Sequence, residues 1–123
     1  MKNNPVGWFE IYVQEMDRAK GFYESVFQIE LENLNSPGMA MWRFSMDASR
    51  YGAGGALVKM EGFPSGGNST LVYFSCEDCA VEESRVEKAG GRIQRKKMSI
   101  GEYGFISLVF DTEGNMIGLH SMQ

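Results

Sequence analysis

The chain has 123 residues, of which 43% are hydrophobic and 23% are charged, the composition of a folded globular protein. This length has room for one domain, or for two small modules that share a core. The formal net charge of -4, with no basic stripe, argues against nucleic acid and anionic membranes as partners. No apolar run approaches the roughly 18 residues of a membrane helix, and residues 1–5 are not followed by the apolar region of a signal peptide, so we expect a cytoplasmic protein.

The first half of the chain predicts the element order β-α-β-β-β. Residues 8–13 alternate between an apolar face (Phe9, Ile11, Val13) and a mixed face (Trp8, Glu10, Tyr12), which predicts a strand. Asp17 can cap a helix whose apolar stripe, at spacings of three and four, is Ala19, Phe22, Tyr23, Val26 and Phe27. Strand-like runs follow at residues 30–35, 39–46 and 55–60.

The second half repeats this order after a connector rich in Gly, Pro, Ser and Asn at residues 62–68. We expect a strand at 71–76, a helix from its cap Asp78 to Ala89, and strands at 92–98, 103–110 and 116–120. Gly114 supplies the positive φ for the turn before the last strand. A shift of 63 residues lays Trp8 on Leu71 and Gly55 on Gly118, which predicts one domain over 1–123, built from modules 5–61 and 69–123 with a linker at 62–68.

Several motifs of the chain, taken in order, resemble one superfamily. They are Trp8–Val13 with Met16–Ala19 and Phe22-Tyr23, then Gly54–Leu57, Ala89–Gly91, Asp111–Asn115 and Ile117–Ser121. Together they resemble the glyoxalase, bleomycin-resistance and extradiol-dioxygenase (vicinal oxygen chelate) superfamily. The resemblance implies an α+β fold in which two paired βαβββ modules form a curved, cup-like mixed sheet with one helix per module outside, and it implies a homodimer.

The resemblance also implies where a metal would be bound. Ligands in the metal enzymes of this superfamily would fall at Trp8, at Gly55 (or at Leu57 or Lys59 if the register slips by two), at Leu71 and at Gly118. None of the first choices offers a donor atom, and His120 is the only histidine. We therefore predict no metal and no cofactor.

Side chains two apart on a strand share a face, so the residues around these positions predict the lining of the cup. The lining is aromatic with a few polar groups, as is usual for a small-molecule site. The predicted ligand-binding residues are Trp8, Glu10, Tyr12, Leu57, Lys59, Leu71, Tyr73 and His120, with Trp42, Tyr103 and Phe105 on neighbouring strands.

Glu10 interrupts an otherwise apolar inward face, where an unpaired carboxylate is costly. One interpretation is an internal pair with Lys59 or His120, or a position at the rim with water. The other is a general base acting on a bound carbonyl compound, with Lys59 or His120 polarising its oxygen. His120 is in turn either an ordinary strand residue or a contact to the ligand.

Two further features have both a structural and a functional interpretation. Cys76 and Cys79 lie where a strand meets a helix, and we interpret them as reduced, buried packing residues in preference to a redox pair. Gly101–Gly104 is either a plain hairpin turn or a lid at the mouth of the cup.

These observations favour a protein that binds a small hydrophobic or aromatic molecule in a metal-free cup. The alternative is an isomerase or lyase acting on a carbonyl or thiol adduct, with Glu10 as its base. A third interpretation is a structural or regulatory protein whose cup is filled by its own side chains.

Overall fold

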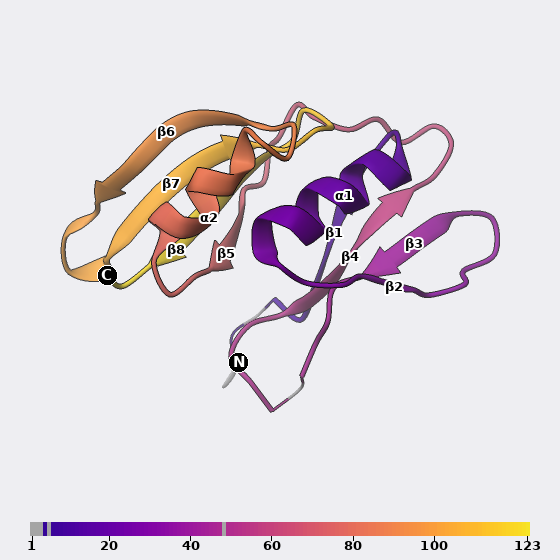
Figure 1. The fold of residues 1–123 in the computed structure, drawn as a ribbon. Coiled ribbons are helices and arrows are strands. Elements are labelled where there is room, and N and C mark those ends of the chain that lie inside the picture. The colour runs from indigo at the N-terminus through magenta and orange to yellow at the C-terminus, as the bar shows by residue number, and fades with distance from the viewer. Residues whose placement is uncertain (1–3, 5, 48) are drawn as a thin grey trace.

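The computed structural model describes residues 4, 6–47 and 49–123 and shows two β-α-β-β-β units in succession (Figure 1). The first unit contains β1 (Trp8–Tyr12), α1 (Met16–Phe27), β2 (Glu32–Asn33), β3 (Ala40–Arg43) and β4 (Gly54–Lys59). The second contains β5 (Val72–Ser75), α2 (Cys79–Val86), β6 (Arg92–Ser99), β7 (Phe105–Phe110) and β8 (Met116–Ser121), with the 3-10 turn η1 (Gly101–Tyr103) between β6 and β7. The predicted α+β class and the two modules are confirmed.

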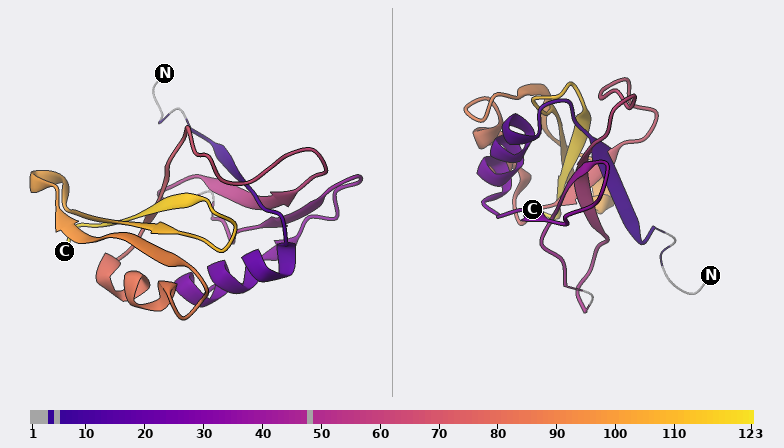
Figure 2. Two further views of the ribbon diagram at one scale, coloured as in Figure 1. Left: turned by 90° about the horizontal axis from the view of Figure 1, so that it is seen from above. Right: turned by 90° about the vertical axis from the view of Figure 1, so that its right-hand side faces the viewer.

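Each unit forms its own four-stranded mixed sheet, in the orders β1-β4-β3-β2 and β5-β8-β7-β6. The first strand of each unit pairs parallel with the last, and the remaining pairs are antiparallel. β1 and β5 are therefore edge strands, and no ladder joins them in the part of the chain that the structure describes. Both helices lie on the same side of the two sheets and leave the opposite face open (Figure 2).

The start of α1 differs from the predicted one. The cap is Glu15, whose carboxylate accepts a hydrogen bond from the Asp17 N–H at 3.2 Å, and Asp17 lies in the first turn, where a negative charge also favours the helix. α2 begins as predicted, with Asp78 accepting from the Ala80 N–H at 3.0 Å. Neither helix of the described chain is long and apolar enough to cross a membrane.

One core lies between the helices and the two sheets. Phe74 of β5 stacks on Phe27 of α1 at 4.5 Å between ring centroids and also packs against Phe9, Tyr23 and Phe44 of the first unit. The two helices also pack against each other. Because apolar side chains of both units are buried together, neither sheet has a separate core.

Polar contacts join the turn before β8 to the first unit. The buried Tyr23 hydroxyl donates to Asp111 at 2.7 Å, and the Asn115 side-chain amide donates to the Tyr12 carbonyl at 2.9 Å. Gly114 has the predicted positive φ, 81°, in this turn. The turn therefore connects the two units as well as two strands.

Candidate ligand-binding site

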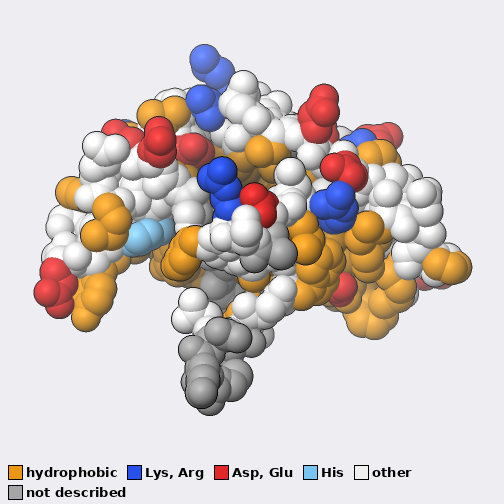
Figure 3. All heavy atoms as spheres, turned by 90° about the horizontal axis from the view of Figure 1, so that it is seen from below, with side chains coloured by type: hydrophobic (Ala, Val, Ile, Leu, Met, Phe, Trp, Pro, Cys, Tyr) orange, Lys and Arg blue, Asp and Glu red, His pale blue; other side chains and the backbone are white. Residues whose placement is uncertain are grey.

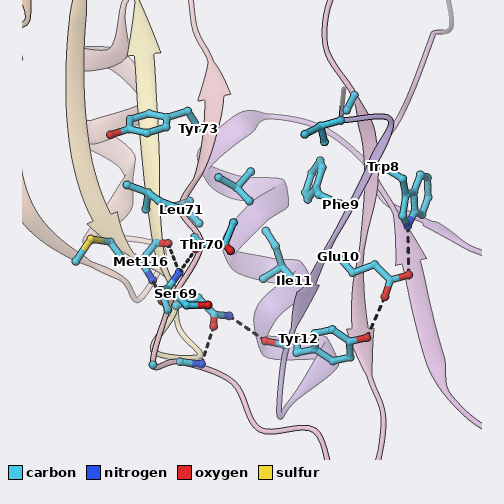
Figure 4. A pocket seen from close by; sticks show the side chains of 18 of the residues that line it. Trp8, Phe9, Glu10, Ile11, Tyr12, Ser69, Thr70, Leu71, Tyr73 and Met116 are labelled. Atoms are coloured by element: carbon cyan, nitrogen blue, oxygen red, sulfur yellow. Dashed lines mark hydrogen bonds between the residues drawn. The ribbon is translucent and has the colours of Figure 1, made fainter. Parts of the chain in front are cut away.

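A cavity of about 710 Å³ lies between the facing edge strands β1 and β5. Its wall on one side is β1, and on the other it is residues 69–73 together with the start of β8 (Figure 4). The connecting loop contributes Pro64, Gly66, Gly67 and Asn68. Among the described residues that line this cavity, Glu10 is the only one with a charged side chain.

The β1 wall carries Trp8, Glu10 and Tyr12 on the open face, as the alternation predicts. The Glu10 carboxylate accepts hydrogen bonds from Trp8 Nε1 at 3.2 Å and from the Tyr12 hydroxyl at 3.0 Å (Figure 4). These hydrogen bonds hold the carboxylate between two aromatic side chains. The hydrogen bond that the Tyr12 hydroxyl donates to Glu10 raises the pKa of Tyr12, because ionisation of the phenol would break this bond.

Of the two structural interpretations of Glu10, the internal pair is wrong, whereas the exposure of Glu10 agrees with a position at the rim. In the described chain no hydrogen bond or ion pair joins Glu10 to Lys59 or to His120. The arrangement for base catalysis, a carboxylate beside a group that polarises the substrate oxygen, is thus not formed by these three residues. The catalytic roles of Glu10, His120 and Lys59 remain predictions.

The β5 wall carries Leu71 and Tyr73, both of which line the cavity. Tyr73 is 46% exposed, and its ring covers Gly118 of β8, with which it is paired in register. Figure 4 shows Tyr73 on the far side of the cavity from Glu10. The structure therefore brings Trp8, Glu10, Tyr12, Leu71 and Tyr73 to one cavity, on two walls.

The predicted orientation of β4 is wrong by one residue. Leu57 pairs with Ile11 and is fully buried in the core under the helices, and Lys59, two residues further, lies on that same side. The shift of 63 residues holds for the first strands, because Phe9 and Val72 both face the helices. It fails for the last strands: Glu10 pairs with Ala56 and the equivalent Tyr73 pairs with Gly118, so Ala56 and not Gly55 is the equivalent of Gly118 on the open face. A slip of one residue exchanges the two faces of a strand, which removes Leu57 and Lys59 from the predicted lining.

Two aromatic residues expected in the cup also lie on the helix side. Trp42 pairs with Leu57 and packs against the core, with Lys20 Nζ of α1 at 3.4 Å from its ring centroid. Phe105 pairs with Ser121 and likewise packs against the core, with Lys97 Nζ at 4.7 Å from its ring centroid. β7 contains no charged residue and β3 has only Arg43 at its end, so the sequence offered little indication of which face of these strands points to the helices.

His120 and Tyr103 lie beside each other at the far end of the second sheet. His120 is paired with Ser75 on the open face, and its Nε2 is 2.7 Å from the Tyr103 carbonyl oxygen. Figure 3 shows the imidazole at the surface with hydrophobic side chains next to it. Neither residue lines the cavity between β1 and β5, so any ligand contact by them would lie outside it.

The open face does not offer the donor set of a metal centre. Trp8, Ala56, Leu71 and Gly118 lie at or next to the four places where the resemblance implies metal ligands, and none carries a donor for a divalent ion. Over residues 4, 6–47 and 49–123, no group of three or more His, Cys, Asp or Glu side chains is placed to hold one. The residues present therefore do not fit the metal.

Main-chain groups add polar character that the sequence analysis missed. The Val13 N–H donates to Val58 of β4 at 2.9 Å, so the main chain of the alternate residues Trp8, Glu10 and Tyr12 faces the gap between the sheets. The hydrogen bond from Asn115 to the Tyr12 carbonyl lies on this side. Every residue of a strand carries a main-chain N–H and C=O, so the sequence cannot show which of these groups stay unpaired. The pairing of β1 with β4 alone shows which main-chain groups of β1 face the gap.

Loop residues were missed as well. Asn68 donates to the carbonyls of Thr70 and Met116 at 3.0 and 2.8 Å and accepts from the Met116 N–H at 3.0 Å, which holds the loop against the start of β8. Asn68 and Thr70 both line the cavity. The only signal for them was a turn-forming composition, which predicts a loop but not where it packs.

Comparison with known proteins identifies the fold. A model of the Glyoxalase/Bleomycin resistance protein/Dioxygenase superfamily matches residues 6–119. The solved structure of glyoxalase I from Zea mays has a TM-score of 0.75 and 18% identity, covering 96% of this chain and 46% of that one, so this chain spans about half the length of the maize protein. No curated protein matches the chain by sequence.

Two shorter structures match over their whole length. A glyoxylase/bleomycin resistance protein/dioxygenase domain from Frankia sp. EAN1pec has a TM-score of 0.72 and 15% identity, covering 99% of this chain and 100% of that one. An antibiotic binding protein from Streptomyces sp. CB03234 has a TM-score of 0.69 and 22% identity, with 98% of each chain covered. Identities this low are evidence for a common fold and for nothing finer.

Proposed function

The chain belongs to the Glyoxalase/Bleomycin resistance protein/Dioxygenase superfamily, and from this premise we propose that it binds a small hydrophobic or aromatic molecule in the cavity between β1 and β5, without a metal. The observation that carries the proposal is the cavity itself. It has room for a small organic molecule, its walls hold Trp8, Tyr12 and Tyr73, and Glu10 is the only charged side chain among the described residues that line it. The fold is also that of a protein from Streptomyces described as antibiotic binding.

Homodimerisation, expected from the resemblance, belongs to the same proposal. Exposed hydrophobic side chains outside the cavity support it, among them Met46, Tyr51 and Met122. Native mass spectrometry of the gently purified protein tests both points, because one spectrum gives the number of subunits and any retained organic mass. A dimer without metal is the expected result, and a stoichiometric metal ion would contradict the proposal.

Binding in this cavity is tested with a panel of small aromatic molecules and a Trp42→Phe variant. Trp8 is then the only tryptophan, it lines the cavity, and its fluorescence should change on saturation by a ligand. Tyr73→Ala should weaken that ligand several-fold, because it removes one wall. Tyr51→Ala is the matched control, since Tyr51 is 88% exposed and outside the cavity. If no molecule of the panel gives a saturable change, the proposal fails.

A further inference from the structure

The charge of the cavity distinguishes between ligands of the same shape. Glu10 is the only charged side chain among the described residues that line it, and no Lys or Arg of the described chain forms an ion pair with Glu10. Its two hydrogen-bond partners, the Trp8 indole and the Tyr12 phenol, are neutral donors. The negative charge of Glu10 is therefore not compensated within this site.

The geometry leaves acceptor positions open on Glu10. A carboxylate can accept about four hydrogen bonds, and here one bond reaches each oxygen, from Trp8 to Oε2 and from Tyr12 to Oε1. The two donors fix the orientation of the carboxylate, so a ligand does not have to order it. Glu10 is exposed, so a second donor can approach each oxygen from the open face of the sheet.

The aromatic side chains on both sides of Glu10 suit the same kind of ligand group. A positive group that approaches Glu10 lies next to the rings of Trp8 and Tyr12, and cations are attracted to the faces of such rings. Phe63 stacks on Tyr12 with a centroid distance of 5.4 Å, which extends the aromatic surface. Phe9 and Ile11 also line the cavity, but from the opposite face of β1.

We propose that the natural ligand of this cavity is an amphipathic organic cation, whose ammonium or amidinium group pairs with Glu10 between Trp8 and Tyr12, and whose apolar or aromatic part extends toward Leu71 and Tyr73. This rests on the proposed function, because it specifies the ligand class of the same site. The net charge of -4 also favours approach of a cation. A neutral ligand would leave the Glu10 charge unpaired, and an anion would be repelled by it.

The test uses three probes with one ring system and different charge: 1-naphthylmethylammonium, 1-naphthylmethanol and 1-naphthoate. Calorimetric titration of the full chain at low salt should show the ammonium probe binding at least fivefold more tightly than the alcohol, and the naphthoate most weakly. Raising the salt from about 0.05 to 0.5 M should weaken the ammonium probe and leave the alcohol unchanged, because salt screens an exposed ion pair.

Glu10→Gln should remove the preference for the ammonium probe while the alcohol still binds. Glu30→Gln is the matched control, because it makes the same change in net charge at an exposed position away from the cavity. A further measurement on the unaltered chain gives the location: the Trp8 indole N–H resonance should shift when the ammonium probe binds, and the Trp42 resonance should not.

The outcomes separate this inference from the proposed function. If the ammonium probe and the alcohol bind equally, or if Glu10→Gln keeps the preference, the inference is overturned while small-molecule binding stands. A preference for the ammonium probe without a shift of the Trp8 resonance also overturns it, because the cation then binds elsewhere. If none of the three probes binds, and no other aromatic molecule does, the proposed function itself fails.

Discussion

At the scale of single residues, the largest difference between sequence and structure is Glu113. Its sequence context, Asp111-Thr112-Glu113-Gly114, predicts only a turn. In the structure the Glu113 side chain is fully buried, although the turn lies near the surface. It accepts hydrogen bonds from two groups of Arg18 at 2.7 and 3.0 Å, from the main-chain N–H of Gln14 and of Glu15 at 2.9 Å each, and from Thr112. A turn of the second unit thus binds the start of α1.

We expect Glu113→Gln to destabilise the protein by about 2 kcal/mol at pH 7, since hydrogen bonds to a charged group contribute about 1.5–3 kcal/mol. Burial raises the pKa of Glu113, but the hydrogen bonds from Arg18 and from the backbone outweigh it and lower the pKa from 4.5 to about 2. For a lowered pKa, the stabilisation is complete above the unfolded value and is lost as the pH falls toward the folded value.

Urea unfolding at pH 7 and pH 3 measures this effect. The difference in free energy of unfolding between the parent and Glu113→Gln should be smaller at pH 3 than at pH 7. Glu61→Gln serves as control, because Glu61 is exposed and its loss should change stability little at either pH. A difference that stays constant with pH would show that the charge of Glu113 is not what stabilises the fold.

At the scale of elements, the two parallel strand pairs differ in where an aromatic ring covers a glycine. The ring of Phe9 covers Gly55 on the buried side of β1 and β4, and the ring of Tyr73 covers Gly118 on the open side of β5 and β8. In each pair a Cβ on the glycine would overlap the ring. The consequence depends on whether that ring can move.

Gly55→Ala should lower the free energy of unfolding by about 1–3 kcal/mol, because Phe9 packs against Phe44 and Phe74 and cannot leave the core without cost. Gly118→Ala should cost less than half of that, because the half-exposed ring of Tyr73 can turn toward solvent. Chemical denaturation of the two variants tests this expectation, and equal losses would contradict it.

The junction between β5 and α2 determines the chemistry of the two cysteines. Cys79 is fully buried and Cys76 partly so. Burial, reinforced by the nearby Glu82 carboxylate, raises the pKa of the Cys76 thiol from 9.0 to about 12. A helix N-terminus favours the thiolate, but it does not outweigh burial and Glu82 at Cys76. The raised pKa agrees with the interpretation of the two cysteines as packing residues and not as a redox pair.

In the folded protein at pH 8 we therefore expect neither thiol to react with Ellman's reagent within minutes, since the nucleophile is the thiolate and Cys76 remains protonated until the pH approaches about 12. Both thiols should react at once after unfolding in guanidinium. The control is the same titration of a Cys76→Ser variant, which should release one equivalent when unfolded. Rapid reaction of the native chain would show that the junction opens.

At the scale of the whole molecule, the two units share one core and should unfold together. Tyr23 is hydrogen-bonded to Asp111, and Arg85 of α2 donates to the Val26 carbonyl of α1 at 3.0 Å. Phe74 lies among aromatic rings of the first unit. Unfolding of either unit alone would expose these groups on the other.

This coupling predicts coincident transitions for two probes. Trp8 and Trp42, the only tryptophans, both lie in the first sheet, so fluorescence follows that unit, whereas far-ultraviolet circular dichroism follows both. In urea the two signals should give the same midpoint. If the fluorescence midpoint differed from the circular dichroism midpoint, the two units would unfold independently, which would contradict the prediction.

By itself, the sequence determined the order of elements, the two-unit plan and the superfamily, because each depends on local signals: alternation in strands, a stripe in each helix, and turn residues between them. It also placed Trp8, Glu10, Tyr12 and Tyr73 on the open face, where mixed polarity marks the strand. Buried strands with apolar residues on both faces carry no such mark. The orientation of Leu57 and Trp42 therefore depended on the register of β4 with β1 and β3, which only the tertiary structure decided.

Contacts between residues far apart in the chain were likewise beyond the sequence. For Glu10 the sequence left open a pair with Lys59 or His120, a position at the rim and a role as a base, and it did not indicate the observed partners, Trp8 and Tyr12. Glu113 was expected only in a turn, but it binds Arg18 across the two units. The reason is the same in both cases: chemistry along the chain specifies what a side chain requires, whereas the packing of the two sheets and their helices decides which group satisfies it.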